Sequence, residues 1–194
     1  MTDFTFYFHL GWKHIISLDA LDHLLFITAL AALYSFAQWR EVLVLVTAFT
    51  IGHSLTLALS VYNMIRVDSV LVEFLIPLTI VITAALNLMK RNSSRLWLNY
   101  ILALFFGLIH VLGFANTIRF MLASDQQIGI PLFSFNLGLE VGQIVVVLIL
   151  LLLSQLIVYL NWPRKYWTIP VSLIVIILAA RMAIERWPSL NNIH

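Results

Sequence analysis

The sequence predicts an all-α protein, a polytopic transmembrane helix bundle with about six spans and an interfacial N-terminal segment. Of its 194 residues, 62% are hydrophobic and only 10% are charged, and the mean hydropathy is +0.99. Charged residues ordinarily make up about 25% of a soluble domain. Several apolar runs have the ~20 residues that a helix needs to cross the hydrocarbon core of a bilayer. We therefore expect residues 1–194 to form one membrane-embedded domain.

The order of the elements follows from the apolar runs and the polar turns between them. Residues 4–16 mix aromatic side chains with His and Lys, which predicts an interfacial lead-in rather than a span. Six apolar runs follow, at residues 18–38, 42–62, 69–89, 96–115, 133–160 and 167–184. The fifth run is longer than the ~20 residues of an upright span, so we expect it to tilt or to begin outside the hydrocarbon.

The basic residues and the absence of cysteine limit orientation and chemistry. Six of the eleven Lys and Arg residues lie in the turns after the first, third and fifth runs. Because cytoplasmic loops carry an excess of Lys and Arg, both termini are expected outside the cytoplasm. The chain has no Cys, which excludes disulfides, thiolate metal sites and Cys nucleophiles. The formal charge of +2 gives no indication of nucleic-acid binding.

Ionisable residues inside the apolar runs are the main functional signal. Such groups are costly at membrane depth, and they usually face the bundle interior and have partners there. A helical rise of ~1.5 Å per residue places several of them at one depth, in the outer third of the bundle. The candidate metal ligands are His14, Asp22, His23, His53, Glu73, His110 and Glu140. Imidazole suits Zn, Ni, Co and Cu, and carboxylates add hard-ion character.

Plainer interpretations exist for individual positions. A single intramembrane His is most simply a hydrogen-bonded bundle residue, and Glu73 could be an interfacial residue at a helix start. Gly138 and Gly142 form a small-xxx-small pair, which predicts close helix packing rather than chemistry. The metal-site hypothesis rests on the number of His and acidic groups at one depth.

Ordered motifs over the first five spans resemble the HupE/UreJ family of membrane proteins. They are DHLLF at 22–26 preceded by His14, TAFTIGHSLTL at 47–57, Val72 with Glu73, Asn87, GLIHVLGFA at 107–115 and FNLGLEVGQ at 135–143. The resemblance implies a nickel or cobalt permease of the bacterial inner membrane, linked to the maturation of hydrogenase and urease. It makes the His and acidic positions candidate ligands for Ni²⁺ or Co²⁺ as cargo.

Two functions from different classes fit these residues. In a permease, outer-facing His and carboxylate groups would bind the ion weakly and pass it inward. In an intramembrane zinc hydrolase, three histidines would hold Zn²⁺ and leave a position open for water. Asp22 or Glu140 would then act as general base, and Ser54 or Asn136 would stabilise an oxyanion. The hydrolase substrate would be a lipid or a membrane-anchored peptide.

A third option is a bundle in which the metal is purely structural. Under every reading the expected partners are a metal ion and the lipid bilayer, together with further copies of the chain if it forms a homo-oligomer. The family resemblance favours the permease.

Overall fold

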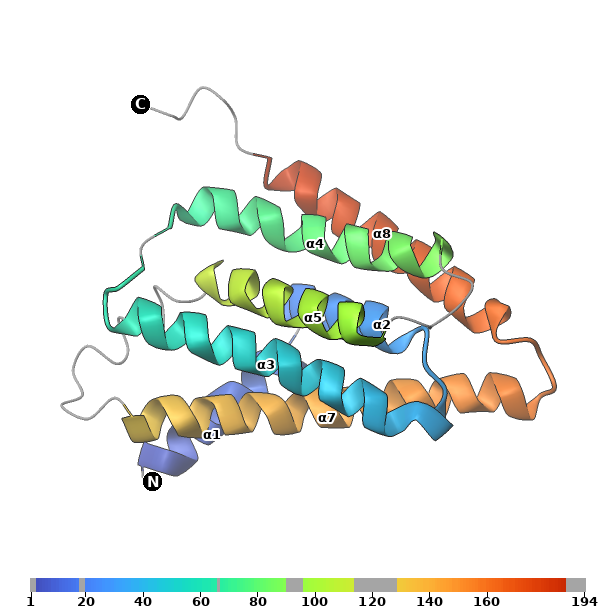
Figure 1. Ribbon diagram of the computed structural model, residues 1–194, viewed down its shortest axis with the longest axis horizontal. Coiled ribbons are helices and arrows are strands. Elements are labelled where there is room, and N and C mark those ends of the chain that lie inside the picture. Colours follow the sequence, from blue (N-terminus) through green and yellow to red (C-terminus); the bar gives the residue numbers. More distant parts are fainter. Residues whose placement is uncertain (1–2, 18–19, 66, 90–95, 114–128, 188–194) are drawn as a thin grey trace.

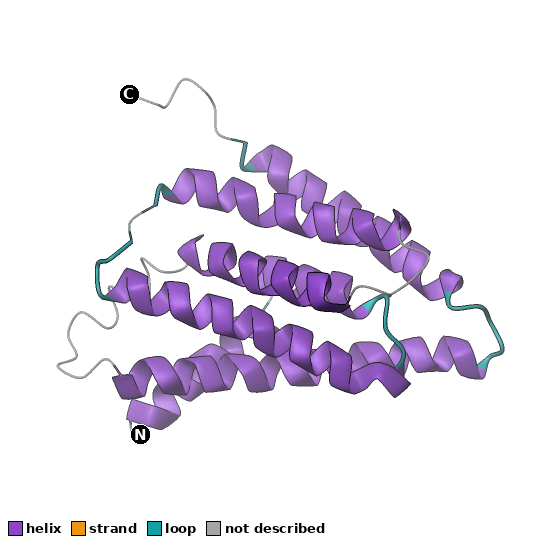
Figure 2. Ribbon diagram, in the orientation of Figure 1, coloured by secondary structure: helices purple, strands orange, loops and turns teal. Residues whose placement is uncertain are grey.

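The computed structural model describes residues 3–17, 20–65, 67–89, 96–113 and 129–187, and helices make up nearly all of these ranges (Figures 1 and 2). The elements are α1 (Asp3–Ile16), α2 (Leu21–Ala31), η2 (Phe36–Gln38), α3 (Trp39–Val61), α4 (Ser69–Met89), α5 (Leu96–His110), η3 (Val111–Gly113), α7 (Gly129–Tyr159) and α8 (Lys165–Glu185). No strand occurs among the described residues, so the predicted all-α class is confirmed.

Four stretches are long and apolar enough to cross a membrane: Phe36–Val61, α4, α7 and α8. The pair α1 and α2 makes a fifth if the two are counted as one span, broken by a bend of 67°. The chain is therefore a multi-pass membrane protein. Helix α5 is apolar but shorter than the predicted run at 96–115, and the end of that run lies outside the described residues.

The first predicted run, at 18–38, differs from the structure. Helix α2 has only 11 residues, and the last residues of the run, in η2, lead into α3. Thr168 donates a hydrogen bond to the Ala32 carbonyl at 2.9 Å, and Arg164 donates one to the Leu33 carbonyl at 2.6 Å. Carbonyls after a helix end need partners, and buried ones in a membrane protein especially so. These bonds from the start of α8 allow α2 to end early.

Helix α1 packs along α7 through glycine (Figure 1). A Cβ atom on Gly11 would lie 2.0 Å from the Phe135 carbonyl oxygen, and one on Gly138 would lie 2.0 Å from the Phe8 carbonyl oxygen. Gly142 also lies against α1. The close packing predicted for Gly138 and Gly142 is therefore confirmed. The N-terminal segment, expected as an interfacial lead-in, forms a helix of 14 residues in the bundle.

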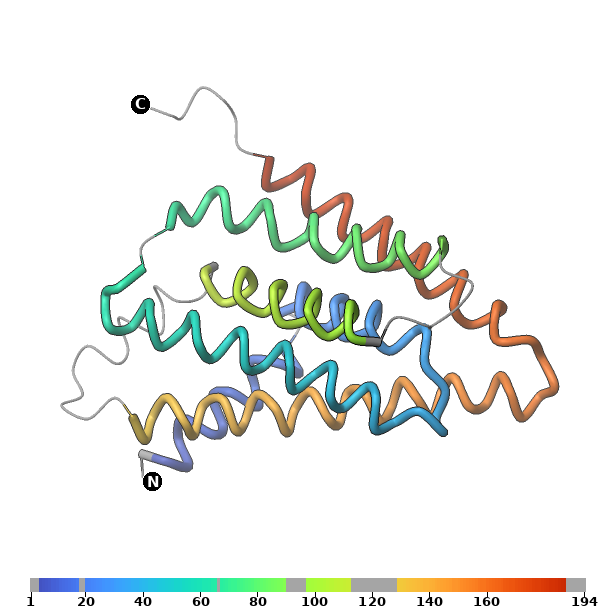
Figure 3. Tube along the Cα trace, viewed as in Figure 1, coloured from blue at the N-terminus to red at the C-terminus, as the bar shows by residue number. Residues whose placement is uncertain are grey.

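Helices α3 and α5 form a second pair of the same kind and run side by side (Figure 3). A Cβ atom on Gly52 would lie 2.2 Å from the Leu104 carbonyl oxygen, and one on Gly107 would lie 2.2 Å from the Phe49 carbonyl oxygen. Small residues let the backbones of membrane helices approach this closely. A third pair, α4 and α8, packs along the opposite edge of the bundle (Figure 1).

Candidate metal centre

Four histidines from four helices meet inside the bundle. They are His14 on α1, His23 on α2, His53 on α3 and His110 on α5. The ring of His23 is at the centre, because its centroid lies 4.9 Å from that of His14, 5.7 Å from that of His53 and 5.5 Å from that of His110. We call these four side chains the histidine cluster.

The cluster is shielded from the surface. The exposed fraction is 3% for His23, 0% for His53 and 1% for His110, while His14 is partly buried. A polar group that is buried without a compensating bond costs free energy. Several imidazoles gathered in one buried interior therefore indicate a specific role for the group.

Hydrogen bonds fix the tautomers of two members. The Nδ1 atom of His110 lies 2.9 Å from the Phe106 carbonyl oxygen, and that of His23 lies 2.9 Å from Asp22 Oδ1. Carbonyl and carboxylate oxygens only accept, so both Nδ1 atoms are donors, and in the neutral ring Nε2 then carries the lone pair. Among the described residues, neither Nε2 atom has a hydrogen-bond partner, nor does either ring nitrogen of His53.

Asp22 therefore belongs to the site as the residue that orients the His23 ring. Its carboxylate also accepts the backbone N–H of His23 at 2.8 Å, and the Arg186 guanidinium lies 3.9 Å from its second oxygen. A carboxylate that holds the Nδ1–H of a histidine presents Nε2 to a metal and increases its basicity.

The distances between ring centroids match those expected for histidines that bind one ion, but the ring nitrogens do not point to a common centre. When two imidazoles bind one tetrahedral ion through metal–nitrogen bonds of about 2.0–2.1 Å, their ring centroids lie roughly 5 Å apart. The centroid distances from His23 are close to this value. Among the described residues, however, no three His, Asp or Glu side chains surround a point so as to hold an ion as they stand. Coordination would require rotation of imidazoles about their side-chain bonds.

The other predicted residues lie apart from the cluster. Glu73 is exposed on α4. Glu140, Ser54 and Asn136 line a groove of about 420 Å³ between α3 and α7, and none of the four histidines lines it. Within that groove Glu140 accepts a hydrogen bond from Thr47 at 2.9 Å. The geometry therefore does not place the groups assigned to a hydrolase around the histidines, apart from Asp22.

Sequence reasoning missed the aromatic rings that pack against the cluster. The Phe26 centroid lies 4.9 Å from that of His110, and the Phe49 centroid lies 5.2 Å from the same ring. Spacing could have identified them, because Phe26 follows His23 by three residues and Phe49 precedes His53 by four. Residues at these spacings share one face of a helix.

The family model described as HupE / UreJ protein matches residues 1–187, which is nearly the whole chain. No curated protein and no solved structure matches.

Proposed function

Because the chain belongs to the HupE/UreJ family, we propose that it is a permease for Ni²⁺ or Co²⁺ and that the histidine cluster binds the ion. Family membership and the apolar helices already identify a multi-pass membrane protein related to nickel or cobalt transport. The proposal adds the cargo, the site and the location, a bacterial inner membrane with both termini on the periplasmic side.

One observation carries the proposal, namely the buried lone pairs of the cluster. The Nε2 atoms of His23 and His110 and the ring of His53 lack hydrogen-bond partners among the described residues. Structures rarely leave buried polar groups without partners, so such groups call for an explanation. Imidazole nitrogen is a preferred ligand of Ni²⁺ and Co²⁺, and a bound ion would satisfy several of these atoms at once.

The proposed ligands are the four histidines, with Asp22 holding His23 in the ligating tautomer. Neutral imidazoles leave the charge of a divalent ion uncompensated in the buried interior, which favours the release that a permease requires. A set of neutral imidazoles that must rotate to converge suits binding followed by release. Glu73 and Glu140 lie away from the cluster and are not assigned as ligands in this proposal.

Reconstitution into sealed liposomes with a metal-sensitive dye in the lumen tests this function. Wild-type protein should carry Ni²⁺ or Co²⁺ to the dye, and His53→Ala should stop the flux because it removes a fully buried ligand. His9→Ala is the matched control, since His9 is exposed on α1, and it should transport like the wild type. Gel filtration in detergent checks that each variant is folded.

The same vesicles separate the permease from the hydrolase. Metal occupancy without flux in sealed, correctly oriented vesicles would refute the permease and favour metal-dependent consumption of an outer-leaflet substrate. Equal flux in the His53→Ala and wild-type proteins would show that the histidine cluster does not take part in transport.

A further inference from the structure

Helix α8 contacts both ends of α2. At its start, Arg164 and Thr168 donate to the carbonyls that follow α2. At its other end, the Arg186 guanidinium lies 3.9 Å from Oδ2 of Asp22, in the first turn of α2. This distance is longer than a hydrogen bond, so the two groups form an ion pair that can separate without breaking one. The last turn of α8 therefore places a positive charge beside the carboxylate that orients the His23 ring.

The Asp22 carboxylate joins Arg186 to the histidine cluster. Its Oδ1 oxygen accepts the Nδ1–H of His23 at 2.9 Å, and its Oδ2 oxygen faces the guanidinium. The exposed fraction of the side chain rises from 3% at His23 to 15% at Asp22 and 33% at Arg186. These three residues therefore mark a path between the surface and the central imidazole.

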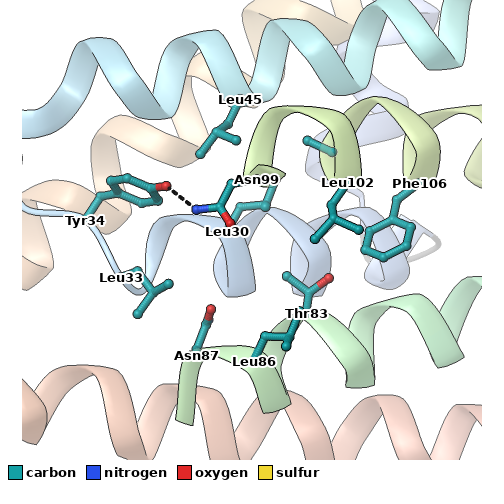
Figure 4. Close-up of a pocket in the computed structure, with 11 residues that line it drawn as sticks. Leu30, Leu33, Tyr34, Leu45, Thr83, Leu86, Asn87, Asn99, Leu102 and Phe106 are labelled. Atoms are coloured by element: carbon teal, nitrogen blue, oxygen red, sulfur yellow. Dashed lines mark hydrogen bonds between the residues drawn. The ribbon is translucent and has the colours of Figure 1, made fainter. Parts of the chain in front are cut away.

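Toward the C-terminal end of α2, the surroundings of the cluster are neutral. Phe106, whose carbonyl oxygen holds the His110 ring, lines a cavity of about 30 Å³ on that side. Figure 4 shows the apolar side chains of this cavity and the hydrogen bond of 3.0 Å that Asn99 donates to the Tyr34 hydroxyl. None of the described residues that line it is charged. Because opposite charge attracts a cation, a divalent ion is drawn to the cluster from the Asp22 side.

We propose that Arg186 controls the entry of divalent cations into the histidine cluster through its ion pair with Oδ2 of Asp22. This inference rests on the proposed function for the identity of the ion. Paired with Oδ2, the guanidinium compensates the carboxylate charge and repels other cations. A divalent ion carries twice the charge of the guanidinium and competes with it for Oδ2. The Arg186 side chain, which is one third exposed, then turns into solvent while the ion passes to the imidazoles.

The rate of Co²⁺ binding to the purified protein in detergent, measured by stopped-flow absorbance, tests this role without relying on transport. Arg186→Gln removes the charge and should speed association at low ionic strength by roughly tenfold, the lower end of the range for electrostatic steering. The difference should shrink toward 1 M salt, where charges are screened beyond about 3 Å. Arg186→Lys retains the charge and should bind as slowly as the wild type.

Arg181→Gln is the matched control. Arg181 lies on the same helix and also pairs with a carboxylate, that of Glu185 at 2.7 Å, but both side chains are exposed. Its substitution changes the net charge by the same amount and should leave the rate of Co²⁺ binding unchanged. Equal acceleration in the two Gln variants would assign the effect to net charge and overturn the role of Arg186. If Arg186 only held α2 in place, Arg186→Gln would bind Co²⁺ more weakly and no faster, which would also overturn it.

Arg186→Cys separates charge from folding, because the chain has no other Cys. A neutral methanethiosulfonate reagent should leave the variant with the fast association of Arg186→Gln. A trimethylammonium reagent of the same class restores a positive charge and should restore slow association in the same folded polypeptide. Equal rates after the two modifications would overturn the proposal.

Flux separates this inference from the proposed function. If wild-type vesicles carry Co²⁺ but Arg186→Gln binds it at the wild-type rate, the entry role fails and the permease stands. If the wild type carries none but Arg186→Gln binds Co²⁺ about tenfold faster, the entry role stands and the permease fails. A wild-type protein that binds no Co²⁺ would overturn both.

Discussion

Replacing Gly52 by Ala should loosen the proposed metal site by separating two helices. The added Cβ atom would lie 2.2 Å from the Leu104 carbonyl oxygen and 3.1 Å from the Leu108 nitrogen. Raising the first distance to the shortest ordinary contact of 3.4 Å requires a displacement of about 1.2 Å between α3 and α5. His53 follows Gly52 directly and must move with it.

The magnitude follows from how narrowly metal sites tolerate displacement. Metal–ligand distances vary by only about 0.2 Å around their ordinary values, so a shift of about 1.2 Å should lower the affinity for Ni²⁺ or Co²⁺ by at least the 10–100-fold seen when ligand support is lost. Overpacking should also reduce the free energy of unfolding by about 1–3 kcal/mol.

Equilibrium dialysis with Ni²⁺ or Co²⁺ measures the affinity, and thermal unfolding in detergent measures the stability. Gly129→Ala is the control, because a Cβ atom there meets nothing within 4 Å, and it should leave both quantities unchanged. A Gly52→Ala protein with wild-type affinity and stability would refute the argument that this contact sets the position of His53.

Three further perturbations address the support of the site and its chemistry. Asp22→Asn should lower metal affinity by about 10–100-fold, since it removes the carboxylate that holds His23; dialysis measures it, with Asp68→Asn, in an exposed loop, as the control. Arg164→Ala should lower the free energy of unfolding by about 1–3 kcal/mol because it leaves the Leu33 carbonyl at the end of α2 without its charged donor; an unchanged melting temperature would contradict this. Bound Ni²⁺ should be released on acidification, since only neutral imidazole binds metal; because burial disfavours the charged ring, release should begin only below the ordinary imidazole pKa of about 6.5, and an occupancy that does not change with pH would argue against histidine ligands.

Some features of the fold could have been anticipated from the spacing of residues along the chain, whereas the positions of several predicted site residues could not. Gly138 and Gly142 indicated close packing from their spacing alone, and the packing is present. Glu73 and Glu140 have the same chemistry and similar predicted depth, yet one is exposed and the other faces a separate groove. Depth along a helix can be counted from residue numbers, but the rotation of each helix about its axis depends on its neighbours.

The sequence by itself determined that this chain is an α-helical membrane protein with histidines inside its apolar runs. Apolar runs of about 20 residues cross lipid as helices, because a helix satisfies its own backbone hydrogen bonds, and composition and run length are local properties. The tertiary structure decided that α2 ends at Ala31, that Asp22 orients His23 and that His53 and His110 face the same ring. These results depend on bonds from α8 and on glycine contacts between helices distant in sequence, which no local pattern specifies.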